Sequence, residues 1–253
     1  MTTNDTPSGD EWRLARAPLP VREPGDPAAF EPFERLRSER LYDSPWCALR
    51  RDHIRTAPGR EQDYHVFEVT NAVAVVPFLE NGDVLMLWHH RHPSGRSQWE
   101  LPAGRIQANE APIDAAAREL LEETGHRARE LVPLPGFFPT GGISAHFAHA
   151  FMAVGCERVA ELQLDPAERL SVHVVPRAVV ERRLHAGHYL DAFTALPLHY
   201  ALARWHRTRQ RLASTAPPAS SRSRTSGYAT SCTATPRSSA SAATTPAAWP
   251  SAM

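Results

Sequence analysis

The sequence predicts a mixed α/β fold, with one main domain of strands and a dominant helix that follows a small N-terminal β-sheet. Three observations support this prediction. The chain has 253 residues, 42% of them hydrophobic, which suffices for one sizeable core. Apolar runs with β-strand composition, separated by turn residues, begin near Tyr42. One stretch, at about 110–124, instead repeats its apolar residues at helical spacing.

The N-terminal part is expected to hold a flexible leader and a small β subdomain. Residues 1–30 are rich in Pro, Arg and acidic side chains and lack apolar periodicity, which is typical of a mobile segment. Within residues 40–70, the runs 46–51 and 63–69 have the composition of strands, and residues 57–60 between them form a turn signal. These two strands predict the small N-terminal sheet.

The main domain is predicted to span residues 71–211. Two apolar runs, 72–79 and 84–88, flank an Asn81-Gly82 turn signal. Such a pair predicts a buried hairpin at the start of the domain.

The dominant helix is predicted over residues 110–124. The loop before it ends at Asn109, a residue type that caps helix N-termini, and Gly125 stands where the helix would close. Its repeating residues are Ile113, Ala117, Leu120, Leu121 and Thr124. Other expected elements are strands at 99–102, 148–154 and 170–175 and an amphipathic helix over 191–207.

Residues 212–253 differ in kind from the rest of the chain. They are dominated by Ser, Ala, Thr and Pro and contain no acidic residue. Such a segment cannot offset its ordering entropy by burial, so we expect a disordered, low-complexity tail. It is either a functional tail or a frameshifted end of the reading frame, and the composition weakly favours the second reading.

Composition excludes several classes of function. The formal net charge is zero, so whole-molecule electrostatics give no argument for a nucleic-acid or membrane partner. The chain has no lysine, which excludes a Schiff-base lysine. Cys47, Cys156 and Cys232 form neither a disulfide framework nor a zinc spacing, and no signal peptide or long apolar run is present. We therefore expect a cytoplasmic protein.

The most informative feature is a group of three carboxylates on the predicted helix. Glu119, Glu122 and Glu123 are spaced i, i+3 and i+4, which places them on one side of the helix. Such a cluster is tolerable where a hard divalent cation neutralises it, and Mg²⁺ or Mn²⁺ prefers oxygen ligands. Gly104 permits a tight turn nearby, so the Ala103 carbonyl could be a further ligand. The alternative is an acidic helix face exposed to solvent.

The spacing of the whole stretch is more specific than the three carboxylates alone. Gly104, Glu110, Arg118-Glu119, Glu122-Glu123 and Gly125 resemble the Nudix box, GX5EX7REUXEEXGU, at every position but the last, which is His126 instead of an aliphatic residue. The resemblance implies a Nudix fold, an α/β/α sandwich around a mixed β-sheet. It implies that Glu119, Glu122, Glu123 and the Ala103 carbonyl bind the metal, while Arg118 and Glu110 orient the helix and loop.

The resemblance also implies a chemistry. A metal that bridges diphosphate oxygens offsets developing negative charge while water attacks phosphorus, with Glu122 and Glu123 as catalytic residues. Three acidic residues later in the chain are candidates for the general base: Glu157, Glu161 and Glu168. Glu168 is preferred because it lies just before the strand expected at 170–175.

Several further segments resemble the ADP-ribose pyrophosphatase branch of this family, between about Trp46 and Arg204. They are residues 46–52, 90–93, 99–104, 138–144 and 186–192. This resemblance implies ADP-ribose or a related nucleoside diphosphate sugar as substrate. It also implies a homodimer that exchanges its N-terminal sheets.

Within this branch, Trp46 would stack on adenine and Arg51 and Arg91 would bind phosphate and ribose. Glu100 would add a carboxylate near the metals. The alternative is that these are core aromatic residues and ordinary strand-edge charges. Two departures weaken the substrate assignment: Ala145-His146 stands where relatives carry an acidic residue, and His89-His90 replaces glutamine-tyrosine.

The predicted activity is hydrolysis of ADP-ribose or a related nucleoside diphosphate sugar. ADP-ribose itself would give AMP and ribose 5-phosphate. Alternative substrates are a GDP-sugar, NADH, another dinucleotide or a nucleoside triphosphate. A non-catalytic Nudix module that senses such ligands is a third reading, which the complete set of box carboxylates disfavours. A zinc site is another alternative, with five histidines as candidate ligands: His89, His90, His92, His146 and His149. Strand alternation disfavours this site because it places neighbouring residues on opposite faces.

Overall fold

The structure, a computed structural model, describes residues 24–57 and 59–215, with side chains up to residue 207. Most of the expected leader, residues 1–23, lies outside this range, and residues 26–33 have no regular structure. The last helix continues to Thr215, past the domain boundary expected at Arg211, and the remainder of the expected tail lies outside the described residues. None of the helices in the described part is long and apolar enough to cross a membrane.

The N-terminal sheet has three antiparallel strands in the order β1-β2-β3. They are β1 (Glu34–Asp43), β2 (Ala48–Thr56) and β3 (Arg60–Glu68). The sequence predicted only the last two, with shorter bounds. β1 was missed because it is mostly charged and exposed on both faces, so it lacks the apolar alternation by which strands are recognised.

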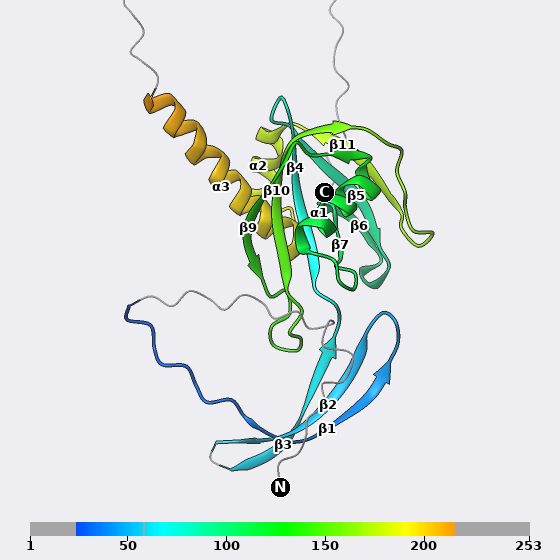
Figure 1. Ribbon diagram of the computed structural model, residues 1–253, viewed down its shortest axis with the longest axis vertical. Coiled ribbons are helices and arrows are strands. Elements are labelled where there is room, and N and C mark those ends of the chain that lie inside the picture. The colour runs from blue at the N-terminus through cyan, green and yellow to red at the C-terminus, as the bar shows by residue number, and fades with distance from the viewer. Residues whose placement is uncertain (1–23, 58, 216–253) are drawn as a thin grey trace, which may run out of the picture. The chain divides into compact units, whose positions relative to one another are not determined.

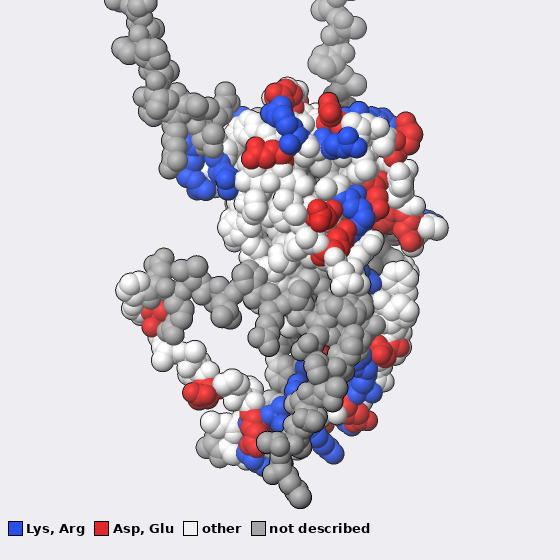
Figure 2. Space-filling view, in the orientation of Figure 1, with Lys and Arg blue, Asp and Glu red and all other residues white. Residues whose placement is uncertain are grey.

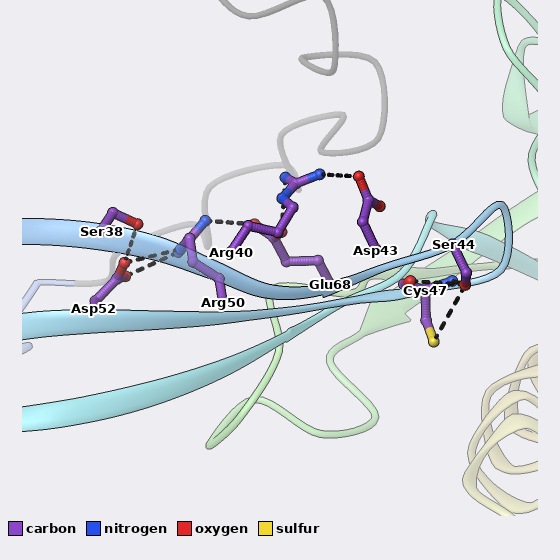
Figure 3. A network of polar contacts seen from close by, with 8 residues as sticks. All are labelled: Ser38, Arg40, Asp43, Ser44, Cys47, Arg50, Asp52 and Glu68. Carbon is purple, nitrogen blue, oxygen red and sulfur yellow. Dashed lines mark hydrogen bonds and ion pairs between the residues drawn. The ribbon is translucent and has the colours of Figure 1, made fainter.

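Ion pairs, rather than an apolar core, hold one face of this sheet together (Figure 3). Ser38 Oγ and Arg50 Nε donate to Asp52 Oδ1 at 2.6 and 3.0 Å. Arg50 also contacts Glu68, which accepts a second hydrogen bond from Arg40 Nη2 at 3.1 Å. Burial would raise the pKa of Asp52, but Ser38 and Arg50 outweigh it and lower that pKa. Both buried carboxylates are thus compensated, as burial of charge requires.

The main domain contains a mixed eight-stranded sheet. Its central order is β11-β5-β4-β10-β8, with β6 on β5, β7 on β4 and β9 on β10, and only β4 and β10 run parallel. The strands are β4 (Ala72–Leu79), β5 (Val84–Arg91), β6 (Arg96–Glu100), β7 (Ala103–Arg105), β8 (His126–Arg127), β9 (Glu130–Phe137), β10 (Ala148–Arg158) and β11 (Leu170–Val175). A short 3-10 helix, η2 (His92–Ser94), joins β5 to β6.

Helices cover both faces of this sheet (Figure 1). The helix α1 (Pro112–Thr124) packs through Ala115, Ala116 and Leu120 on Val73, Val75 and Leu85. On the opposite face, α2 (Arg177–His185) and α3 (Ala192–Thr215) pack through Val180, Leu184, Leu198 and Leu202 on Val76, Phe78 and Met86. Alternate residues of β4 and β5 thereby enter two different cores. The predicted α/β/α arrangement is confirmed.

The start of α1 differs from the prediction. Asn109 is not the cap: it adopts a left-handed conformation with φ 62°, and Ala111 is the N-cap. Pro112 follows in the first turn, where its missing N–H costs nothing and its fixed φ suits a helix. The predicted end is right, because Gly125 has φ 69° and its N–H bonds to Leu121 O at 2.8 Å.

Surface charges of the main domain pair locally. Arg129 Nη1 lies 2.8 Å from Glu80 Oε2, and Arg158 Nη2 lies 2.8 Å from Glu161 Oε2. Acidic and basic side chains accordingly lie next to one another over much of the face in view (Figure 2). This interleaving agrees with the zero formal charge of the chain.

Candidate active site

The carboxylate side of α1 faces the short strand β7. Glu119 and Glu123 are buried, with 9% and 3% relative exposure. Gly104 of β7 lies so close to Glu119 that a Cβ at this position would stand 2.1 Å from the carboxylate. Glycine at this position therefore lets the Glu119 carboxylate lie against the strand, and an added Cβ would displace it. The glycine that the sequence analysis assigned to a tight turn serves this close approach.

Burial disfavours the ionised state of two of these carboxylates. Burial raises the pKa of Glu123 well above its usual range, although the Ala103 N–H donates to Glu123 Oε2 at 2.9 Å. Burial also raises the pKa of Glu119, against the opposing effect of Arg118. The charge of Glu168 raises the pKa of both. The site as a whole favours added positive charge.

Arg118 links the helix α1 to the loop that precedes it. Its Nη1 donates to Glu119 Oε1 at 2.7 Å and to Glu122 Oε2 at 3.0 Å. Its Nε and Nη2 donate to the two carboxylate oxygens of Glu110 at 2.8 and 2.9 Å, and Nη2 also donates to the Arg105 carbonyl at 2.9 Å. The hydrogen bonds that Arg118 donates to Glu110 and Glu119 raise its pKa, although burial acts in the opposite direction. This geometry suits the orienting role expected for Arg118 and Glu110.

The donor set fits a hard divalent cation. Within the described part of the chain, no three His, Cys, Asp or Glu side chains are grouped as a ready-made metal site. Glu119 and Glu122 instead share Arg118. Two of the three carboxylates are nevertheless buried beside the main chain of Ala103, and oxygen donors of this kind are the ligands that Mg²⁺ and Mn²⁺ prefer.

A cleft of about 500 Å³ adjoins this carboxylate group. Ala103 and Gly104, which contact Glu123 and Glu119, form part of its wall. Its charged lining residues are Arg91, Glu100, Arg105 and Asp191. Clefts of a few hundred Å³ with a few convergent polar groups are the usual form of small-molecule sites.

Arg91 is held at the cleft by Glu100. The guanidinium donates from Nε to both carboxylate oxygens, at 3.1 and 2.9 Å, and from Nη2 to Oε2 at 2.7 Å. Burial would raise the pKa of Glu100, but the contact with His89 and the hydrogen bonds from Arg91 outweigh it and bring that pKa to about 2. Glu100 is therefore an ionised partner of Arg91, and it lines the same cleft as Ala103 and Gly104. Its expected place near the metals stays a prediction.

The structure places Trp46 and Arg51 differently with respect to the cleft. Trp46 is 65% exposed in the turn between β1 and β2, and the Arg105 guanidinium lies 5.0 Å from the centre of its ring. Trp46 does not itself line the cleft but contacts Arg105, which does. Arg51 is not among the lining residues and pairs with Glu39 and Asp63 on the N-terminal sheet.

Of the three candidates for the general base, Glu168 has the closest link to the carboxylate group. Its charge acts on Glu119 and Glu123, as their raised pKa values show. Its Oε2 accepts a hydrogen bond from the Asp165 N–H at 2.9 Å. Glu161 is 89% exposed and pairs with Arg158. Glu157 is exposed in β10.

The sequence analysis missed two lining residues at the start of α3, Asp191 and Phe193. Asp191 Oδ2 accepts a hydrogen bond from Thr194 Oγ1 at 3.1 Å, and burial, with the charge of Glu100, raises the Asp191 pKa. Phe193 packs beside His146, with ring centroids 5.7 Å apart. Asp191 belongs to the segment 186–192, which resembles the ADP-ribose pyrophosphatase branch, but this resemblance alone assigns no role to it. Phe193 lies just after that segment. The histidines considered for zinc form no metal group within the described residues.

Comparisons with known proteins agree with this geometry. The NUDIX domain model matches residues 69–194, and the model of the nucleoside diphosphate sugar hydrolase N-terminal domain matches residues 33–67. The chain is 34% identical to an ADP-ribose pyrophosphatase of Mycobacterium tuberculosis, over 63% of this chain and 78% of that protein. It is 26% identical to an ADP-ribose pyrophosphatase of Bacillus subtilis, over 65% and 90% of the two chains.

A solved structure extends the similarity to the fold. The crystal structure of an ADP compounds hydrolase superposes with a TM-score of 0.64 at 19% identity, and the match covers 73% of this chain and 100% of that one. At this identity the likeness concerns the fold alone.

Proposed function

Because the chain belongs to the Nudix family and is a pyrophosphohydrolase of that family, we propose that it cleaves the diphosphate bond of ADP-ribose or a related nucleoside diphosphate sugar. The products would be a nucleoside monophosphate and a sugar phosphate. The observation that carries this proposal is the position of the buried carboxylates of α1 against the strand that walls the 500 Å³ cleft.

Divalent cations, with Mg²⁺ as the first choice and Mn²⁺ as the second, would be held by Glu119, Glu122, Glu123 and the Ala103 carbonyl. When bound, they offset the charge that develops on the diphosphate and lower the pKa of a water molecule. Glu122 and Glu123 would be catalytic residues, and Glu168 would take the proton from the attacking water. Arg118 connects the glutamates of α1 to the loop at Glu110 through its hydrogen bonds and would fix their relative position.

Substrate recognition would use both sheets. Arg91 offers its free N–H groups to phosphate, and Trp46, backed by Arg105, offers an aromatic face to the base. Arg51 lies away from this cleft, so we propose that it acts in a homodimer, where exchanged N-terminal sheets would bring it to a partner's substrate. The free thiols of Cys47 and Cys156 agree with a cytoplasmic location.

The test is hydrolysis of ADP-ribose by purified protein, with AMP as the measured product, in Mg²⁺, in Mn²⁺ and in excess chelator. Chelation should abolish turnover. Glu122→Gln and Glu123→Gln should each lower kcat about 100-fold or more, since each removes a charged ligand from the metal group. Glu130→Gln, an exposed glutamate of β9, is the matched control and should keep full activity.

A substrate panel ranked by kcat/KM then tests the specificity. ADP-ribose should rank above GDP-sugars, NADH and nucleoside triphosphates. Normal turnover in Glu122→Gln would refute the metal assignment, and ligand-induced stabilisation of the wild type without any product would indicate a sensing module instead of an enzyme.

A further inference from the structure

Four polar side chains form one cluster on the cleft side of the β5–β6 pair. His89 and Gln98 are cross-strand partners, and Arg91 and Glu100 each lie two residues further along their strand. Because side chains of a strand alternate between faces, all four share a face, while Trp88 and Trp99 share the other. Arg91, Gln98 and Glu100 line the cleft, and His89 lies behind them.

His89 is a buried member of this cluster. The side chains of His89 and Glu100 are each 3% exposed, and His89 Nδ1 lies 3.2 Å from Glu100 Oε2. Among the described residues this nitrogen has no hydrogen bond of good angle, and the Glu100 carboxylate is the acidic group that lies within contact distance of it. A buried polar nitrogen of this kind is retained at a cost unless its neighbour compensates it.

The remaining contacts of Glu100 determine the direction of Arg91. Gln98 Nε2 donates to Oε1 at 2.8 Å and His89 Nδ1 lies 3.2 Å from Oε2, so each carboxylate oxygen has a second neighbour besides Arg91. Arg91 uses Nε and one N–H of Nη2 on the same carboxylate. A guanidinium has five N–H donors, which leaves about three for the cleft. The Arg91 side chain is 44% exposed, so these donors are within reach of a ligand.

We propose that His89 is a positioning residue of this active site: with Gln98 it holds the Glu100 carboxylate in the orientation that aims the free N–H groups of Arg91 at the substrate diphosphate. This inference rests on the proposed function for its substrate. A glutamine at position 89 could supply an N–H donor to Glu100 in place of the imidazole.

The experiment compares His89→Leu and His89→Gln with His90→Leu, the same change at the neighbouring position on the opposite face. KM and kcat are measured with ADP-ribose and Mg²⁺, and Kd is measured by calorimetry with α,β-methylene-ADP, a diphosphate that cannot be hydrolysed. His89→Leu should raise KM and Kd about tenfold, as loss of a contact to a charged group does, with kcat within about threefold of wild type. His89→Gln should restore both constants, and His90→Leu should leave them unchanged.

Two further variants keep the test decisive. Gln98→Leu acts on the same carboxylate from a less buried position and should shift KM and Kd in the same direction even where His89→Leu does not fold. In an Arg91→Lys background, His89→Leu should raise KM and Kd little further, because the effect of His89 on substrate binding passes through Arg91. Full additivity, an unchanged Kd in His89→Leu, or an equal loss in His90→Leu would each overturn the proposal. If the wild type binds α,β-methylene-ADP but does not hydrolyse ADP-ribose, the proposed substrate is wrong and the Kd series still tests His89.

Discussion

At Gly104 the backbone of β7 passes so close to Glu119 that an added Cβ would overlap the Glu119 carboxylate. Close packing in this site also has an electrostatic effect. Burial raises the pKa values of Glu119 and Glu123, and so does the charge of the neighbouring Glu168. Single residues thus determine whether the carboxylates stay ionised and in reach of the cleft. This dependence makes the site sensitive to the loss of one charge or the addition of one methyl group.

Gly104→Ala should lower activity at least about tenfold, because its Cβ would stand 2.1 Å from the Glu119 carboxylate and push it out of place. The cost in unfolding free energy should lie at or below the low end of the range usual for overpacking, about 1–3 kcal/mol, because the atoms that must move are the end of a flexible side chain. Gly142→Ala is the control, since nothing lies within 4 Å of its added Cβ and its φ is not positive. Activity assays and urea unfolding measure the two effects. Equal behaviour of the two variants would show that the close approach has no functional weight.

Glu100 gives a prediction about pH. Its folded-state pKa is about 2, below the ordinary value of 4.5, so its pairing stabilises the fold fully above pH 4.5. That stability is lost as the pH falls from about 4.5 to about 2. The difference in unfolding free energy between wild type and Glu100→Gln should therefore be largest above pH 4.5, on the order of 1–2 kcal/mol after allowance for solvent screening, and should shrink towards pH 2. A constant difference across this range would contradict the assigned pairing.

At the scale of elements, the sequence predicted those whose apolar pattern decides their structure. The strands at 72–79 and 170–175 have the predicted bounds, and the end of α1 at Gly125 is right. β9 was missed because Pro133 and Pro135 break its pattern, which is tolerated in a strand that pairs only with β10. β1 was missed because ion pairs across strands replace apolar alternation, and such pairs depend on tertiary partners that local patterns do not reveal.

The site follows the same rule. The carboxylates of α1 were predictable, because helical spacing alone brings Glu119, Glu122 and Glu123 together. The link between Arg91 and Glu100 was not, since it depends on the register of β5 with β6. Asp191 reaches the cleft only through the packing of α3, far along the chain.

The end of α1 gives a prediction at this scale. Gly125 and Gly187 both have left-handed backbones, with φ of 69° and 71°. A Cβ added at Gly125 would lie 2.2 Å from the Ala160 carbonyl oxygen, whereas a Cβ added at Gly187 would have no atom within 4 Å. Gly187→Ala should therefore cost about 1 kcal/mol of unfolding free energy, from backbone strain alone. Gly125→Ala should cost about 2–4 kcal/mol, since the clash adds to the strain. Denaturant unfolding of both variants measures the difference, and equal costs would show that the loop at Ala160 yields freely.

At the scale of the whole molecule, the apolar cores mark which part of the chain the fold needs. Both buried clusters are built from residues between Val73 and Leu202, with Trp205 packed at the edge. Trp205 stacks on Phe78 with ring centroids 4.7 Å apart, so α3 is required at least to that position. The similarity to the NUDIX domain model ends earlier, at residue 194, which shows that sequence similarity alone would place the boundary too soon.

A chain that ends at Thr215 should therefore keep the kcat/KM and the thermal midpoint of the full protein, because both clusters and the cleft lie within it. A chain that ends at Arg204 loses Trp205 and with it the stack on Phe78. Because Trp205 is only partly buried, the loss should cost less than the about 3–5 kcal/mol typical of a fully buried aromatic side chain. Differential scanning calorimetry and AMP release are measured on all three proteins. A loss of activity on truncation at Thr215 would show that residues 216–253 take part in folding or in the reaction, and would also argue against a frameshifted end of the reading frame.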